Sequence, residues 1–424
     1  MAPMEIFLQR LLYALLLALA LPLIPLRLFV RGFKERGYWR NIGERFGFGR
    51  VKARHPVWVH AVSVGEARAA APLVERFLGQ GKPVLVTCMT PAGRATALQL
   101  FGDRVQVRYL PYDFPWAAQR FIRQARPERC VIMETELWPN LLRAARRAGA
   151  PIYLVNARLS EKSARRYRKV AAFAREALSA FSAVAAQTDE DAARLRELGA
   201  PSVSVAGNLK FDIDPSPALI EMGQRFRELI GNRPVWLAAS TRDGEEKRIL
   251  EVYKRTAPAQ TLLVLVPRHP QRFDEVAALA RAQGLPLQRR SEQAPVSEAT
   301  RVWLGDSLGE MFAYYAAADC ALIGGSLLPY GGQNLIEACA VGCPVLVGPH
   351  TENFKQVAEQ AVALGAALRV ADAGEWADKA RFLSGDSLAR QRMGTAGMAF
   401  AAAHKGAAER TFRLVTADGS AARA

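Results

Sequence analysis

The chain has 424 residues, of which 50% are hydrophobic and 23% charged, and this composition is typical of a folded globular protein. A disordered chain and a small scaffold held by disulfides are therefore excluded, and the length predicts two or three domains with cores of their own. Lys and Arg (57) outnumber Asp and Glu (40), so the formal net charge is +17. Such an excess predicts an anionic partner, which can be nucleic acid, a membrane surface or an acidic substrate.

The N-terminal segment is apolar and is followed by a basic one. Residues 11–26 carry no charge, but sixteen residues are fewer than the roughly 20 that span a bilayer, and Pro22 and Pro25 interrupt the end of the run. The segment therefore spans a membrane, only dips into it, or is a buried core helix. Residues 27–54 hold nine Lys or Arg against two Glu, whereas only Arg10 precedes the run. This order differs from that of a secretory signal peptide and predicts an anchor that leaves the rest of the chain in the cytoplasm.

A second basic block covers residues 141–170, with nine Lys or Arg against the single Glu161. Arg158, Lys162, Arg165 and Lys169 recur at intervals of three and four, so the pattern predicts one positive helix face. That face is either ordinarily solvated or in contact with anionic lipid headgroups. No nucleic-acid-binding motif accompanies it, so we favour lipid and predict no nucleic-acid partner.

The five cysteines lie mostly within apolar runs, and none has a zinc-ligand spacing with histidines. We expect reduced thiols and no structural metal. Cys339 and Cys343 are expected to serve in packing.

Short apolar runs alternate with helical patterns from residue 57 onward, and this alternation predicts a parallel α/β protein. A polar, proline-bearing stretch near residue 212 divides the runs into two similar sets, so we place a domain boundary there. Open α/β sheets bind ligands beyond the carboxyl ends of their strands, and two such sheets would hold a ligand in the cleft between them. The predicted strands are 57–64, 84–89, 105–110, 130–133, 152–157, 183–187 and 203–207, then 235–240, 261–267, 301–305, 320–325 and 344–349.

Acidic and basic side chains follow several of these strands. Glu66 lies between a strand and a helix, where it can act as a general base or simply complement the positive helix end. Glu134 and Glu136 follow another strand and can stabilise charge or form ordinary salt bridges. Lys210 lies at the junction of the two halves, where a cation can reach a phosphate.

The C-terminal half carries the more specific pattern. Arg268 and His269 follow a strand, and paired glycines at 324–325 and 331–332 precede Asn334 at a predicted helix start. Backbone N–H groups at such a start can bind an anion, and the glycines let a phosphate approach closely. Glu337 in the first turn can accept hydrogen bonds from ribose hydroxyls. The pattern is neither a Walker A loop nor the dinucleotide-binding fingerprint.

Seven segments occur together in order: VSVGE, METELWPNL, NARLS, GNLKFD, PRHPQRF, GDSLGEM and GGQNLIEACAVGCPVLVGPHTENF. In this combination the chain resembles the 3-deoxy-D-manno-octulosonic acid (Kdo) transferases of Gram-negative bacteria. The resemblance implies a GT-B fold, in which two Rossmann-like domains face each other across a cleft. It also implies an N-terminal anchor (1–40), an acceptor-binding domain (41–211) and a CMP-Kdo-binding domain (212–424) whose last helices can pack back on the preceding domain.

The resemblance further implies an inverting glycosyltransferase at the cytoplasmic side of the inner membrane, which moves Kdo from CMP-Kdo to a lipid A precursor in lipopolysaccharide biosynthesis. By the motifs, Glu66 is the general base, and Glu134 and Lys210 assist the transition state. No metal and no cofactor are implied. Gln333 stands where several relatives have histidine. The CMP contacts carry over to Pro267, Arg268, Leu308, Gly309, Glu310, Asn334, Leu335, Ile336 and Glu337.

Two alternatives remain open at this point. One is another membrane-associated GT-B enzyme that uses a UDP-sugar. The other is a non-catalytic protein that binds anionic surfaces, which only the net charge favours and which leaves the glutamates and glycine pairs at the strand ends unexplained.

Overall fold

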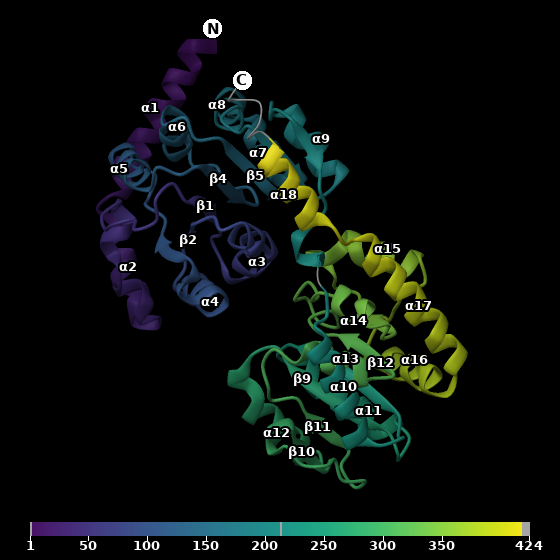
Figure 1. Cartoon of the computed structure of the whole chain (residues 1–424). Coiled ribbons are helices and arrows are strands. Elements are labelled where there is room, and N and C mark those ends of the chain that lie inside the picture. The colour runs from purple at the N-terminus through teal and green to yellow at the C-terminus, as the bar shows by residue number, and fades with distance from the viewer. Residues whose placement is uncertain (1, 213, 418–424) are drawn as a thin grey trace. The chain divides into compact units, whose positions relative to one another are not determined.

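The computed structural model describes residues 2–212 and 214–417 (Figure 1). The chain divides into two compact units. The first unit comprises Met1–Asp212 together with Gly406–Ala424, and the second unit comprises Ile213–Lys405. The C-terminal helix thus belongs to the first unit, although it follows the second unit in the sequence.

The first unit is built on a seven-stranded parallel sheet in the order β3-β2-β1-β4-β5-β6-β7. Its central strands β1 and β5 are buried along their whole length, and β4 is buried from Cys130 onward, as continuous apolar runs predict for a parallel sheet covered on both faces. All seven strands lie within or next to the predicted runs. They are β1 Val57–His60, β2 Val84–Cys88, β3 Gln106–Tyr109, β4 Arg129–Met133, β5 Ile152–Ala157, β6 Ala183–Ala186 and β7 Val203–Val205.

Helices connect and cover these strands, so that two apolar clusters of buried side chains form on the sheet. The C-terminal helix α18 (Ala407–Ala417) joins one of these clusters with Ala407, Ala408 and Val415. The other covering helices are α3 Val64–Gly79, α4 Pro91–Phe101, α5 Pro115–Ala125, α6 Pro139–Arg147, α7 Glu161–Arg168, α8 Ala171–Leu178 and α9 Asp189–Glu197.

Two further helices form the N-terminal segment: α1 (Ala2–Ala20) and α2 (Leu23–Lys34). Within the described residues, no single helix is both long enough and apolar enough to cross a membrane. The stretch Ile6–Ala20 combined with Leu23–Lys34 meets both criteria, but the two helices are bent by 51° relative to each other. The predicted membrane anchor is thus a bent helix pair.

The second unit has its own seven-stranded parallel sheet, in the order β10-β11-β9-β8-β12-β13-β14. Five of these strands match predicted runs. The two edge strands, β10 and β14, were not predicted, because three-residue strands with polar, partly exposed side chains lack a continuous apolar pattern. The strands are β8 Val235–Thr241, β9 Leu262–Pro267, β10 Leu287–Arg289, β11 Val302–Leu304, β12 Cys320–Ile323, β13 Val345–Val347 and β14 Ala367–Arg369.

The core of this unit is rich in aromatic residues. Trp236 packs edge-on against Trp376 at a ring-centroid distance of 5.6 Å, and both are fully buried. Cys339 and Cys343 are buried as well, which agrees with the prediction that they serve in packing. The helices are α10 Pro217–Ile230, α11 Glu245–Thr256, α12 Phe273–Ala282, α13 Met311–Ala317, α14 Ile336–Ala340, α15 Lys355–Ala363, α16 Ala373–Gly385 and α17 Ser387–Ala403.

The burial of α18 gives a test of the domain division. Val415 is fully buried in the first unit, so Val415→Asp places an unpaired charge in its core and should lower the free energy of unfolding by about 3 kcal/mol or more. Ala417→Asp, at an exposed position of the same helix, should lower the free energy of unfolding by less than about 1 kcal/mol. Urea denaturation followed by circular dichroism measures both. Equal effects of the two substitutions would contradict the packing of α18 in this core.

Candidate functional site

Glu66 lies in the first turn of α3, directly after strand β1. Ser63 caps this helix and accepts a hydrogen bond from the Glu66 backbone N–H, while its hydroxyl donates to Glu66 Oε1 at 3.0 Å. The Val62 N–H donates to Glu66 Oε2 at 2.9 Å. The spacing Ser-x-x-Glu is that of a capping box, which explains why the chain folds this way locally. The carboxylate is therefore held in one orientation and is only 7% exposed.

Glu134 and Lys210 form an ion pair near this carboxylate. Lys210 Nζ lies 2.8 Å from Glu134 Oε1, and both charges act on the pKa of Glu66. Glu134 follows β4, the neighbour of β1 in the sheet, and its φ of 56° is in the left-handed region, which is uncommon for a residue other than glycine. The structure thus brings the side chains of Glu66, Glu134 and Lys210 together.

Asn156 holds the turn that carries Lys210. Its side-chain oxygen accepts a hydrogen bond from Leu209 N–H at 2.9 Å, and Asn208 caps the same turn by accepting from Lys210 N–H at 2.9 Å. Asn156 is buried at the end of β5 and has a φ of 51°. Sequence reasoning assigned it no role. The polar Asn in an otherwise apolar strand was the available signal.

Burial raises the pKa of two carboxyl groups in this cluster. For Glu66 the main cause is loss of solvent; the charge of Glu134 adds to it, while the Val62 N–H, the Ser63 hydroxyl and Lys210 counteract it. For Glu136 burial, together with the charges of Glu66 and Glu134, raises the pKa to about 7. Carboxyl groups with raised pKa values are suited to proton transfer near neutral pH.

The second unit gathers its predicted residues at the carboxyl edge of its own sheet. Pro267 ends β9, and Arg268 follows with its backbone N–H bonded to Thr241 O at 3.0 Å. Burial lowers the pKa of His269, and the nearby charges of Arg242, Arg268 and Arg272 lower it further. Arg272 pairs with Asp243, Glu246 and Glu275, so the charges of Arg242 and Arg268 are the ones that favour an anion there.

Glu310 and its neighbours follow β11 at the same edge. Leu308 is exposed, and Gly309 has a φ of 83°, which glycine adopts without strain. The Glu310 carboxylate accepts hydrogen bonds from the Ser307 hydroxyl at 2.5 Å and from Arg290 at 3.2 Å. These contacts fix the loop but leave little of the carboxylate for a ligand.

The glycine-rich loop after β12 ends at the short helix α14. Asn334 accepts a hydrogen bond from Ile336 N–H at 3.1 Å and donates to Glu337 at 3.3 Å. Leu335 and Ile336 are buried, so their side chains pack in the interior. Gly324 lies so close to β8 that an added Cβ would be 2.4 Å from Ser240 O.

Glu245 supports this loop and was missed by sequence reasoning. It is fully buried in the first turn of α11 and accepts hydrogen bonds from Gly325 N–H at 2.7 Å and Leu327 N–H at 2.9 Å. It also accepts one from Arg242 N–H at 2.8 Å. Glu245 follows the predicted strand 235–240 as Glu66 follows the predicted strand 57–64, and this position could have identified it from the sequence.

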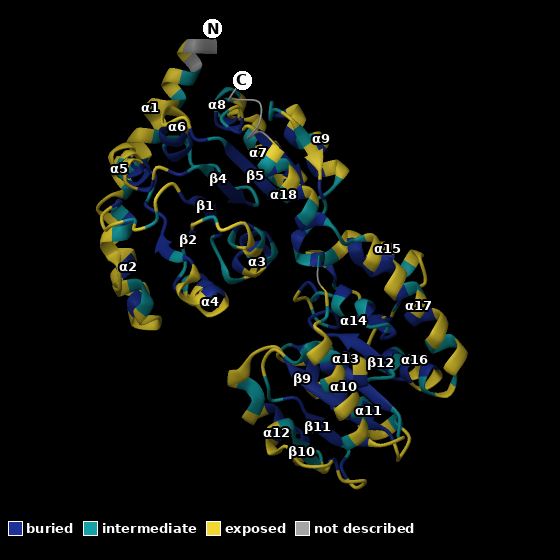
Figure 2. Cartoon of the chain, in the orientation of Figure 1, coloured by how far each residue is buried: buried dark blue, intermediate teal, exposed yellow. Residues whose placement is uncertain are grey.

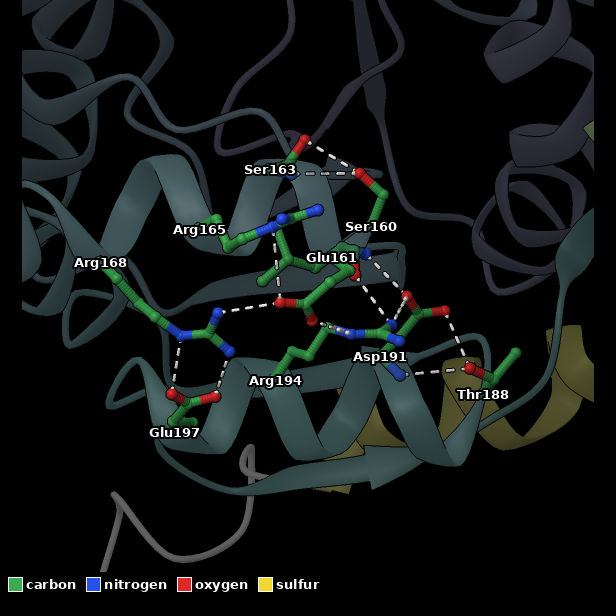
Figure 3. A network of polar contacts seen from close by, with 10 residues as sticks. Ser160, Glu161, Ser163, Arg165, Arg168, Thr188, Asp191, Arg194 and Glu197 are labelled. Carbon is green, nitrogen blue, oxygen red and sulfur yellow. Dashed lines mark hydrogen bonds and ion pairs between the residues drawn. The ribbon is translucent and has the colours of Figure 1, made fainter.

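The predicted positive face in residues 141–170 is only partly available. Helix α7 covers Glu161–Arg168, so Arg158 and Lys169 lie outside it. Figure 3 shows that Arg165 and Arg168 contact Glu161, and that Arg168 also binds Glu197 at 2.8 Å. Part of this positive charge is therefore neutralised within the unit.

Arg45, in the N-terminal basic block, is not at the surface either. It is 1% exposed, lies over the Tyr109 ring at 3.8 Å and donates to Met89 O. It acts as a structural residue of the first unit.

The chain has the two-sheet architecture of GT-B-like proteins. It is similar to HepE of Anabaena in complex with UDP, with a TM-score of 0.58, 15% identity and coverage of 86% of this chain and 100% of that one. It is also similar to a putative UDP-N-acetylglucosamine 2-epimerase of Listeria monocytogenes, with a TM-score of 0.54, 15% identity and coverage of 88% and 98%. At these identities the likeness shows the fold alone.

The sequence comparisons define the family. Residues 40–213 match the family model described as 3-deoxy-D-manno-octulosonic-acid transferase (kdotransferase). A 3-deoxy-D-manno-octulosonic acid transferase of Bordetella pertussis is 47% identical, covering 94% of this chain and 97% of its own length. One of Haemophilus influenzae is 38% identical, covering 96% and 98%. The chain belongs to the 3-deoxy-D-manno-octulosonic acid transferase family and is a glycosyltransferase of lipopolysaccharide biosynthesis, which confirms the resemblance.

The raised pKa of Glu136 predicts a pH-dependent stability. A carboxyl group whose pKa is raised on folding contributes stability below its unfolded pKa, and this contribution is lost as the pH rises through the folded value of about 7. Between about pH 5 and pH 8 the free energy of unfolding of the wild-type protein should therefore fall on the order of 1–2 kcal/mol more than that of Glu136→Gln.

Urea denaturation at both pH values measures the difference between the two proteins. Glu251→Gln, at an exposed position of α11, is the control and should follow the wild type. Parallel pH curves for wild type and Glu136→Gln would contradict the raised pKa.

Proposed function

We propose that the protein moves Kdo from CMP-Kdo to a hydroxyl of a lipid A precursor, lipid IVA, at the cytoplasmic side of the inner membrane. The observation that carries the mechanism is the Glu66 carboxylate, which is buried, oriented by two hydrogen bonds and raised in pKa. The names of the related transferases support Kdo as the transferred group. The exposed apolar surface of α1 and α2 supports the membrane location.

Glu66 is the general base of this proposal. It takes the proton of the acceptor hydroxyl as that oxygen bonds to the anomeric carbon of Kdo, and the bond from this carbon to the phosphate oxygen breaks, so CMP leaves with the electron pair. A single displacement inverts the anomeric centre. The raised pKa strengthens the base, and the Val62 N–H, the Ser63 hydroxyl and the charge of Lys210 lower the pKa and so favour the ionised form that accepts the proton.

Arg268 and the loop that ends at Asn334 bind the donor in this proposal. The positive charge around His269 suits the single phosphate of CMP, and a phosphate held by cations is a good leaving group, so no second carboxylate is needed as a general acid. Glu134 and Lys210 stabilise charge in the transition state. Pro267, Leu308, Gly309, Glu310, Leu335, Ile336 and Glu337 complete the proposed CMP contacts.

The test is transfer from CMP-Kdo, generated in situ, to a tetraacylated lipid A precursor in detergent, with products weighed by mass spectrometry. Wild type should add Kdo, and Glu66→Gln should be slower by about 10²–10⁴-fold because the base is lost. Glu75→Gln, at an exposed position of the same helix, should retain activity. Near-normal turnover of Glu66→Gln would refute the base assignment.

The donor site is tested separately by CMP binding. Arg268→Ala removes a charge-assisted contact to phosphate and should weaken CMP binding by about tenfold or more, whereas Arg281→Ala, exposed on α12, should have no effect. Isothermal titration calorimetry measures both. Tighter binding of UDP than of CMP to the wild type would favour the UDP-sugar alternative.

A further inference from the structure

Helix α1 is docked on the first unit along one stripe of side chains. Ile6, Gln9, Tyr13, Leu17 and Ala20 are partly buried, at intervals of three and four that place them on one helix face. The opposite face is apolar and exposed, as the yellow segments of α1 in Figure 2 show. That face comprises Phe7, Leu8, Leu11, Leu12, Leu15, Leu16 and Leu19, each at least 55% exposed.

Polar contacts hold the docked stripe to helices α6 and α8. The Tyr13 hydroxyl donates to Asp113 Oδ2 at 2.9 Å. Asp113 is itself buried and accepts hydrogen bonds from two backbone N–H groups at the start of α6, at 3.0 and 2.8 Å. Gln9 accepts from Phe173 N–H at 3.0 Å, and Arg10 pairs with Glu176, which also contacts Arg143 of α6.

These contacts conflict with a membrane-crossing orientation of α1. The helix is about 28 Å long at 1.5 Å per residue, so a crossing helix would carry Gln9, Arg10 and Tyr13 into the hydrocarbon together with the part of α8 and the Asp113 loop that they bind. Polar groups and charged helices are strongly disfavoured there. A helix that lies flat on the bilayer keeps the docked stripe in the protein and places only leucines and phenylalanine in the lipid.

Helix α2 repeats this arrangement. Ile24, Leu28 and Gly32 face the protein at intervals of four, and Trp39 packs over Gly32. Its exposed apolar residues are Leu23, Leu26, Phe29, Val30 and Phe33. Three exposed cations, Arg27, Arg31 and Lys34, lie on the same helix between the apolar and the buried faces. An apolar face bordered by cations is typical of a helix in the interface of an anionic membrane.

We propose that α1 and α2 lie in the plane of an anionic membrane surface as one interfacial element built into the first unit, and do not cross the bilayer. This inference rests on the proposed membrane location of the enzyme and specifies its geometry. The lipid surface is the partner of the exposed apolar faces of both helices, and the cations of α2 contact its headgroups. The catalytic unit is therefore held flat against the membrane and is not suspended from a flexible tether.

The test is a depth measurement on full-length protein. Leu8, Leu12, Leu15 and Leu19 lie on one exposed face of α1, so each is replaced singly by cysteine and spin-labelled; the five native cysteines are buried. Collisional relaxation with oxygen and a nickel chelate gives each label's depth in vesicles of phosphatidylethanolamine and phosphatidylglycerol. A label at the exposed Asp378 of the second unit is the control and should remain in water.

In-plane docking predicts the same shallow depth for the four labels within about 5 Å, one helical turn. A crossing helix predicts depths that change by about 16 Å between Leu8 and Leu19, and this result would overturn the inference. Labels that stay in water would also overturn it. Spectral broadening between spin labels in the absence of vesicles, which would show that two copies associate through α1, would overturn it as well. Binding to phosphatidylcholine vesicles should be several-fold weaker, and equal binding would contradict the role of the cations.

Kdo transfer to detergent-dispersed acceptor, measured on the same labelled proteins, separates the two proposals. If the enzyme is active but the label depth changes steadily along α1, the in-plane geometry alone is refuted. An inactive but correctly docked wild-type enzyme refutes the proposed reaction alone.

Discussion

The buried carboxylate in the first helical turn after the first strand of a sheet is the constraint on which both units depend. In the second unit, Glu245 is fully buried and accepts hydrogen bonds from three backbone N–H groups, two of them in the glycine-rich loop. Its carboxylate therefore serves to hold this loop in place. In the first unit, Glu66 accepts one backbone N–H and one hydroxyl and keeps a small exposed fraction. Both are glutamates in the first turn of the helix after a strand, but Glu66 is the third residue of α3 and Glu245 the first residue of α11, and one carboxylate is chemically available whereas the other is structural. The number of internal donors decides between these outcomes.

The strands and the residues at their ends were predictable because parallel sheets impose strong patterns. Buried strands are mainly apolar, and polar residues directly after them lie at one edge of the sheet. Glu66 and Glu134 each follow a strand, which the sequence indicated, but they lie close together because β1 pairs with β4, and the sequence pattern did not give this strand order. Lys210 follows the edge strand β7, and its approach to Glu134 depends on the turn that Asn156 holds, which no local pattern revealed.

Other features depended on tertiary contacts that sequence patterns do not encode. Arg45 looked like one more surface cation in a basic block, but two aromatic rings and a carbonyl oxygen hold it in the interior. Arg165 looked like part of a free positive face, but it pairs with Glu161 of the same helix. Runs of charged residues predict the sign of a region's net charge better than they predict which charged side chains reach the solvent. Ion pairing depends on neighbours that are distant in sequence.

The return of the chain at Gly406 also affects how the protein is made. The chain leaves the first unit after Asp212 and returns to it at Gly406. At this junction Asp212 accepts hydrogen bonds from the N–H groups of Gly406 and Ala408, and Asp214 pairs with Lys405. The second unit is thus an insertion whose two ends meet, and it can fold as soon as it has been synthesised. The first unit must wait for α18, which is synthesised after the whole second unit, to complete its core. During synthesis the apolar N-terminal helices therefore emerge long before the unit that holds them is finished, so an early encounter with the membrane would shield them from aggregation during this interval.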